Sequence, residues 1–212
     1  MSKYFTKIHD LEPKEYLTEI IKSTKRPVSD KNIQKILGAF ESVVFEKNTQ
    51  IIKQGDVATH LYFISKGIIR VYYHKSGKEL IDWFAEEGCF FGNLYSHILK
   101  KPGLDIYESI EDVELLRIKY SELENLYKGS HEIEAIARIF MEQYYVRYIE
   151  RAHYLKGLLS DEKYYAFLKS YERCVNRIPL KYVANYLGIT SETLSRIRSK
   201  YDKKNKKEKN AS

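Results

Sequence analysis

The sequence predicts an α+β protein that contains an antiparallel β-roll, a long helix and a C-terminal pair of short helices. Three observations predict it. Short β-branched and aromatic runs with glycine-bearing turns fill residues 42–120, a three-to-four-residue apolar period spans 132–159, and a tight helix-turn-helix spacing occupies 178–198. We expect three segments with boundaries at 1–131, 132–159 and 160–212.

Two helices are predicted before the roll. Leu17, Ile20 and Ile21 form one apolar cluster, and a second cluster at helical spacing ends at Phe40. Pro27 lies between the two clusters and interrupts the helical pattern. We expect Asp30 to be the N-cap of the second helix.

The roll is predicted from strand-like runs at regular spacing. Glycine-bearing turns at Ser65–Gly67 and Lys75–Lys78 separate two of them. Such spacing is typical of an antiparallel barrel or sandwich. The predicted strands cover residues 43–45, 49–52, 61–64, 68–73, 80–84, 106–110 and 113–118.

One long amphipathic helix follows the roll, and a shorter helix is predicted over 161–174. An apolar stripe of this length requires a partner, which is either the protein's own roll or a second copy of the chain. We expect a homodimer formed through the long helix. The stripe consists of Ile133, Ala137, Phe140, Tyr144, Tyr148, Ala152, Leu155 and Leu159.

The strongest pattern lies between Ile178 and Arg198. Pro179 suits a first helical turn, and Gly188 supplies the left-handed conformation that a sharp turn between two helices requires. Thr190 is a suitable N-cap for the second helix. Val183, Ala184, Leu187, Leu194 and Ile197 form the predicted inner faces.

Polar side chains remain on the outer side of this pair, and they suit base edges and phosphates of double-stranded DNA. The alternative is an ordinary helical hairpin, whose outer face is also polar. Residues 176–212 contain ten basic and three acidic residues, whereas 1–175 contain 26 of each, so this end carries the whole net charge of +7. A local basic excess is typical of a polyanion partner, although a solvated tail has the same composition. The predicted DNA contacts are Lys181, Ser191, Glu192, Thr193, Ser195, Arg196, Arg198 and Lys200.

The order of elements resembles the Crp/Fnr family of bacterial transcription regulators over nearly the whole chain. Gly55-Asp56, residues 61–64 and Gly67 resemble early strands of a cyclic-nucleotide-binding domain, and residues 91–94 resemble the start of its phosphate-binding cassette. The resemblance implies a dimer through the long helix, a second motif helix in the major groove and RNA polymerase as a partner. It places Ser191, Glu192 and Arg196 at base-contacting positions.

The sequence departs from this family in two places. Asn93 replaces the glutamate that would bind ribose, and Gly103-Leu104 replaces the Arg-Ser pair that would hold the cyclic phosphate. A buried phosphate without its cationic partner is costly, so we expect no cyclic AMP binding in the usual mode and leave the effector unassigned. A lysine-rich tail after Lys200 replaces the usual β-hairpin wing. The corresponding ligand pocket would consist of Gly92, Asn93, Leu94, Gly103 and Leu104.

Other functional classes find little support in the sequence. No apolar run is long enough to span a membrane and the N-terminus does not resemble a signal peptide, so we expect a cytoplasmic protein. Cys89 and Cys174 are too few for an iron–sulfur cluster, and His74 and His97 are isolated, so we expect no metal or haem. No catalytic constellation is present, and we expect no enzyme. The competing interpretation is a small-molecule-sensing or protein-interaction module that does not bind DNA.

Overall fold

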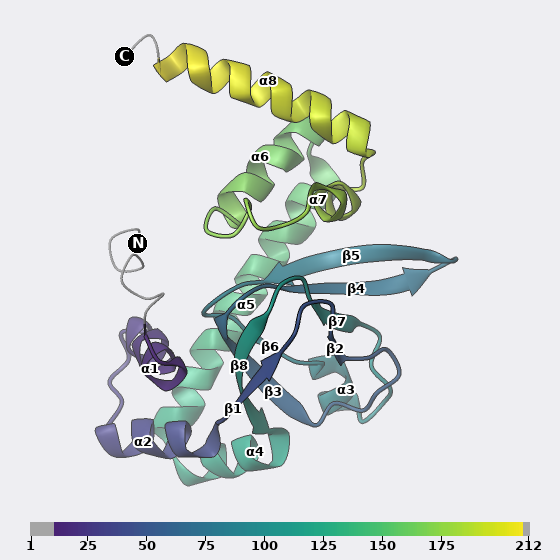
Figure 1. Ribbon diagram of the computed structural model, residues 1–212. Coiled ribbons are helices and arrows are strands. Elements are labelled where there is room, and N and C mark those ends of the chain that lie inside the picture. Colours follow the sequence, from purple (N-terminus) through teal and green to yellow (C-terminus); the bar gives the residue numbers. More distant parts are fainter. Residues whose placement is uncertain (1–10, 210–212) are drawn as a thin grey trace. The chain divides into compact units, whose positions relative to one another are not determined.

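The computed structural model describes residues 11–209, with side chains through Lys203. Two compact units divide the chain, Met1–Tyr144 and Tyr145–Ser212, and Figure 1 shows their elements. The helix α5 (His131–Gly157) contributes residues to both units. The mixed α+β class and the antiparallel roll are confirmed, and the three predicted segment boundaries stay a prediction.

Two four-stranded sheets form the roll in the first unit. One has the strand order β1-β8-β3-β6 and the other β2-β7-β4-β5, and all pairings are antiparallel. The strands are β1 (Glu41–Phe45), β2 (Gln50–Ile52), β3 (His60–Lys66), β4 (Ile69–Lys75), β5 (Lys78–Ala85), β6 (Phe90–Phe91), β7 (Ile106–Ser109) and β8 (Val113–Lys119).

A tight turn between β3 and β4 makes Gly67 necessary. Its φ is +98°, and a Cβ there would lie 2.6 Å from Cγ1 of Val113. Its backbone N–H donates to the buried carboxylate of Glu87 at 2.8 Å. Both the conformation and the space therefore exclude a side chain at this turn.

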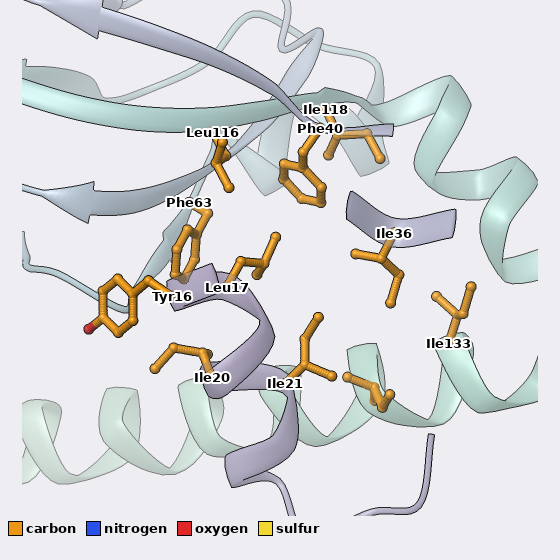
Figure 2. Close-up of a cluster of buried hydrophobic side chains, with 11 residues drawn as sticks. Tyr16, Leu17, Ile20, Ile21, Ile36, Phe40, Phe63, Leu116, Ile118 and Ile133 are labelled. Carbon is orange, nitrogen blue, oxygen red and sulfur yellow. The ribbon is translucent and has the colours of Figure 1, made fainter. Parts of the chain in front are cut away.

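Helices α1 (Pro13–Ser23) and α2 (Asp30–Ala39) pack with the first turns of α5 against β3 and β8. Figure 2 shows the shared cluster, in which Leu17 and Ile21 lie among Phe63, Leu116 and Ile133. The predicted second helix is confirmed, although its N-cap is Ser29 rather than Asp30. The two N-terminal helices are thus part of the core of the first unit.

Glu132 in the first turn of α5 joins that helix to the start of α2. Its carboxylate accepts hydrogen bonds from the Ser29 backbone at 2.9 Å, the Ser29 hydroxyl at 2.8 Å and the Asn32 amide at 2.7 Å. These hydrogen bonds, led by the Ser29 backbone N–H, lower the pKa of Glu132 below its usual value.

The stripe predicted along α5 does not have a single environment. Ile133 is buried in the core of the first unit, and the ring of Phe140 lies 5.1 Å from that of Phe90. All residues from 141 to 150 are exposed. The first part of the stripe therefore packs on the protein's own roll, and a charge at Phe140 would disturb that core rather than a dimer seam.

Three elements of the first unit are absent from the sequence prediction: β6, α3 (Leu94–Leu99) and α4 (Tyr120–Gly129). α4 follows β8 directly, so the strand-like run before it conceals its start. Short elements such as β6 carry too little periodicity to be detected.

The second unit contains α6 (Ser160–Ser170), α7 (Leu180–Leu187) and α8 (Ser191–Lys209). The helix predicted over 161–174 ends at Ser170, and turns follow it. Aromatic rings form the interior of the second unit. The ring centre of Phe167 lies 4.9 Å from that of Tyr171 and 5.5 Å from that of Tyr186. The prediction that only a tail follows Lys200 is wrong, because α8 continues to Lys209.

Candidate nucleic-acid interface and ligand pocket

The turn between α7 and α8 has the local chemistry that the sequence predicts. Gly188 ends α7 in the left-handed conformation with φ +66°, and its N–H donates to the carbonyl of Asn185 at 3.0 Å. The hydroxyl of Thr190 accepts from the backbone N–H of Thr193 at 3.1 Å. A glycine C-cap and a threonine N-cap thus hold the two helices three residues apart.

Both predicted inner faces are confirmed by burial. On α7, Val183, Ala184 and Leu187 are 1–3% exposed. On α8, Leu194 is 1% and Ile197 8% exposed. Because these positions fix the rotation of α8 about its axis, the opposite side of α8 faces solvent.

The solvent side of α8 carries most of the predicted DNA contacts. Ser191, Glu192, Ser195 and Arg196 are all exposed, and Thr193 is half-buried. One Arg196 amino group donates to the Thr193 hydroxyl at 3.3 Å, which steadies the guanidinium one turn into the helix. Lys181 on α7 is also exposed, with its ammonium 4.8 Å from the ring centre of Tyr182.

Arg198 and Lys200 differ from the other predicted contacts because α6 engages both. Arg198 is half-buried. Burial raises the pKa of the Tyr164 hydroxyl on α6, and the nearby guanidinium of Arg198 opposes that rise. The ammonium of Lys200 lies 3.6 Å from the carboxylate of Asp161. These two cations position α8 on its own unit.

The sequence did not point to two residues of α8. Ser199 is exposed three positions after Arg196, and the i, i+3 spacing could have placed it on the same exposed face as the predicted contacts. Tyr201 packs against α6, a role that its spacing of four from Ile197 could have suggested.

In the first unit, Asn93 of the predicted ligand pocket makes its side-chain hydrogen bond to the protein's own backbone. Its side-chain oxygen accepts from the Ser96 backbone at 3.1 Å and caps α3. The residue is 1% exposed, and its amide nitrogen has no hydrogen-bond partner within the described residues. The side chain therefore points into packed protein.

Gly103 lies directly against Asn93. A Cβ at Gly103 would be 2.1 Å from the Asn93 amide nitrogen and 3.2 Å from the carbonyl oxygen of Asp56. Backbone hydrogen bonds of 2.9 Å connect Gly103 to Gly55 and to Asp56. The two positions that would hold ribose and phosphate in the family pattern are thus packed on each other. Leu94 is half-buried and Leu104 is exposed.

Aromatic side chains fill the roll next to this cassette. The ring of Phe91 stacks on Tyr62 at 5.0 Å and on Tyr107 at 5.6 Å. The Tyr107 hydroxyl donates to the carbonyl of Gly92 at 3.1 Å, and burial raises its pKa well above the usual value. The cassette backbone is therefore hydrogen-bonded to a ring of the roll's own core.

The buried arginine of the roll is neutralised internally. Arg70 on β4 pairs with Glu108 on β7 at 2.8 Å and also with Glu79 on β5. The Tyr72 hydroxyl donates to Glu108 at 2.8 Å, and burial, followed by the Glu108 contact, raises the Tyr72 pKa to about 12. This cation is already matched by carboxylates of the same sheet.

Comparison with protein families gives one match within the first unit. Residues 42–130 match the cyclic nucleotide-binding domain. The matched residues include nearly the whole roll together with α4. No curated protein matches the sequence.

Solved structures share the fold along most of the chain. The regulator CLP of Xanthomonas campestris superposes with a TM-score of 0.65 at 19% identity, covering 84% of this chain and 93% of its own. FixK2 of Bradyrhizobium japonicum has a TM-score of 0.66 at 20% identity, covering 78% and 86%. The catabolite activator protein of Thermus thermophilus has a TM-score of 0.53 at 18% identity, covering 86% and 87%. The predicted resemblance to Crp/Fnr-type regulators is therefore confirmed for the fold.

Within residues 11–209, no helix is long and apolar enough to cross a membrane. In the same part of the chain, no group of three or more His, Cys, Asp or Glu side chains could hold a metal ion. His97 stacks on Tyr120 with 3.7 Å between ring centres, and the ring of His74 lies 5.6 Å from that of Tyr72.

Proposed function

We propose that this protein is a sequence-specific DNA-binding transcription regulator of the Crp/Fnr type, working in the cytoplasm without enzymatic activity. Residues 1–131 would form the sensor segment, 132–159 the dimer helix and 160–212 the DNA-binding segment. α7 and α8 would act as a helix-turn-helix, with α8 in the major groove. RNA polymerase would be the partner through which DNA binding changes transcription.

One observation carries this proposal: the polar face of α8 is open while its apolar face is buried. Glu192, Ser195 and Arg196 are exposed on the side opposite Leu194 and Ile197. The same helix lies in the part of the sequence that holds the whole net charge. Hydrogen-bonding side chains on a basic helix fit base edges and phosphates together.

The test is selection of a binding site from random duplex DNA, followed by fluorescence anisotropy with selected and scrambled duplexes across a salt series. We expect one enriched sequence with two-fold symmetry, whose half-sites are about 34–36 Å apart. Absence of any enriched sequence, with no DNA binding at low salt, would favour the competing sensing or interaction module.

We also propose that α5 mediates a homodimer. Within the second unit, Tyr145, Tyr148 and Ala152 follow the three-then-four spacing of a coiled-coil seam, and the two tyrosines are 63% and 50% exposed. Large apolar side chains gathered on one face of a helix mark an interaction surface. A second copy presents the same face, as two-fold symmetry requires.

Light scattering at micromolar concentration tests the dimer. Tyr145→Glu places a charge in the seam, and we expect it to shift the protein toward monomer. The matched control is Gln143→Glu, because residue 143 is exposed on the opposite side of the helix. A monomeric wild type, or equal dissociation by both variants, contradicts the proposed seam.

The roll is proposed not to bind cyclic AMP in the usual mode. The support is the packing of Asn93 on Gly103, the aromatic filling beside Gly92 and the internal pairing of Arg70. We expect a dissociation constant weaker than about 1 mM, which corresponds to about 4 kcal/mol. Isothermal titration calorimetry that gives a micromolar constant would contradict this.

A further inference from the structure

α8 is much longer than the segment that would read bases. It has 19 residues, whereas α7 has 8. At 1.5 Å per residue its length is about 28 Å, and the part up to Arg198 accounts for about 12 Å. The remaining residues, 199–209, contain six lysines and two acidic residues.

Contacts with α6 hold the second half of α8. The ring of Tyr201 lies 6.1 Å from Tyr164, edge to face, and 5.4 Å from Tyr165. One residue earlier, Lys200 pairs with Asp161 at the N-terminus of α6. We name these contacts the Tyr201 clasp. They fix the direction of α8 after its last buried aliphatic residue, Ile197.

The exposed face of α8 is continuous across the clasp. Glu192, Arg196, Ser199 and Lys203 are spaced by four, three and four residues, which places them on one side of a helix, and all four are exposed. Lys206 and Lys207 follow in the sequence. The exposed face that carries Glu192 and Arg196 therefore continues along the same helix to a lysine, Lys203, in the lysine-rich part of the chain.

We infer that residues 199–209 are a rigid helical arm that binds phosphates of the DNA backbone beside the half-site, aimed by the Tyr201 clasp. The inference rests on the proposed function. DNA is favoured over other polyanions because the arm shares its face with the reading residues. A helical arm that is already ordered binds backbone phosphates at a lower entropic cost, because less of the protein must become ordered upon binding.

The first experiment removes charge. Lys203→Gln, Lys206→Gln and Lys207→Gln are combined in the full-length protein. Anisotropy is then measured on selected and scrambled duplexes from about 50 to about 200 mM salt, a range over which phosphate contacts change the affinity strongly. We expect equal weakening on both duplexes and a salt slope reduced by roughly 5 for the dimer, because each of its two arms loses three phosphate contacts at about 0.9 each. An unchanged slope overturns the arm.

The second experiment keeps every lysine and releases the arm. Tyr201→Ala removes the ring contacts of the clasp and keeps the Lys200–Asp161 pair, and Tyr201→Phe is the matched control because it keeps the ring. We expect Tyr201→Ala to weaken binding to both duplexes roughly tenfold, with Tyr201→Phe near wild type and both variants folded by circular dichroism. Wild-type affinity for Tyr201→Ala overturns the clasp.

The two experiments distinguish a failure of the proposed function from a failure of the arm. If wild type binds no duplex at low salt, the proposed function fails and the arm with it. If wild type reads a specific sequence while the lysine variants keep its affinity and slope, only the arm is wrong.

Discussion

The cassette of the roll and the α7–α8 pair both occupy positions of a known binding motif, yet the polar side chains are buried in the cassette and exposed in the pair. In the cassette, Asn93 caps α3 and packs on Gly103. In the pair, Glu192 and Arg196 are exposed while apolar neighbours hold the helix. A motif position whose polar atoms face solvent is available to a partner, and one whose polar atoms serve the fold is not.

The same contrast appears in charge. Arg70 in the roll is buried and matched by Glu108 and Glu79. Arg196 on α8 is exposed and donates a hydrogen bond of 3.3 Å to the hydroxyl of Thr193, which a base edge can replace. A buried charge is stable only when it is paired, and the charge of Arg70 is already paired with carboxylates of the roll.

The largest effect that this comparison predicts is on stability, and it is confined to the roll. Phe63 is fully buried among α1, β3 and β8, so Phe63→Ala should lower the free energy of unfolding by about 3–5 kcal/mol. Arg196→Ala should change it by less than about 0.5 kcal/mol, because the side chain is exposed. Chemical denaturation checks both. A large loss for Arg196→Ala would mean that the open face of α8 is structural.

The next effect is on DNA recognition, where Arg196 and Arg198 form a matched pair. Arg196→Ala should reduce discrimination between selected and scrambled duplexes by about 1–3 kcal/mol, the value of a bidentate contact to guanine. Arg198→Ala should leave that ratio unchanged, since Arg198 is half-buried and its guanidinium lies near Tyr164 of α6. Anisotropy on both duplexes measures the ratio. Equal effects of the two variants would show that exposure does not distinguish reading from positioning.

Local chemistry explains which parts of the fold could be predicted. Gly188, Thr190 and the buried faces of α7 and α8 follow from spacing and capping alone, and the structure has them where the sequence places them. The strands of the roll likewise follow from period and turns. The start of α4 at Tyr120 could not be predicted, because β8 continues into it without a turn residue.

Long-range packing explains what was missed. Phe140 and Tyr148 share one apolar pattern, but only the three-dimensional position of Phe90 assigns Phe140 to the core. The length of α8 was missed because a lysine-rich segment resembles a solvated tail, and the contact of Tyr201 with Tyr165 joins residues 36 positions apart. The closure of the cassette depends in the same way on the contact between Asn93 and Gly103.

A smaller effect is expected where the cassette is closed. Gly103→Ala should lower the free energy of unfolding by about 1–2 kcal/mol, because its new methyl group must displace the buried Asn93 amide. In an Asn93→Ala background the same change should cost less, since the amide is gone. A double-mutant cycle measured by denaturation gives this coupling. Additive effects of the two substitutions would mean that the two residues do not restrict each other.

The smallest effect concerns Glu132, the surface carboxylate that joins α2 to α5. Its pKa is lowered in the folded state by hydrogen bonds from Ser29 and Asn32, so the ionised form contributes stability above the unfolded pKa. That contribution is lost as the pH falls below 4.5 through the lowered folded value. Glu132→Gln should therefore be less stable than wild type at pH 7, and the difference should shrink as the pH falls through this range.

Glu134→Gln is the control for this last prediction. Glu134 lies in the same first turn of α5 and so shares the favourable interaction with the helix N-terminus, but its carboxylate faces the exposed His131 instead of α2. Thermal unfolding of both variants between pH 3 and pH 7, roughly the range over which carboxylates titrate, separates the two contributions. If the curves of the two variants coincide at every pH, the hydrogen bonds to α2 add nothing beyond the helix dipole. If only Glu132→Gln loses stability at neutral pH, the carboxylate holds the N-terminal helices on the roll, and the first unit is closed at this edge by its own side chains, as it is at the cassette.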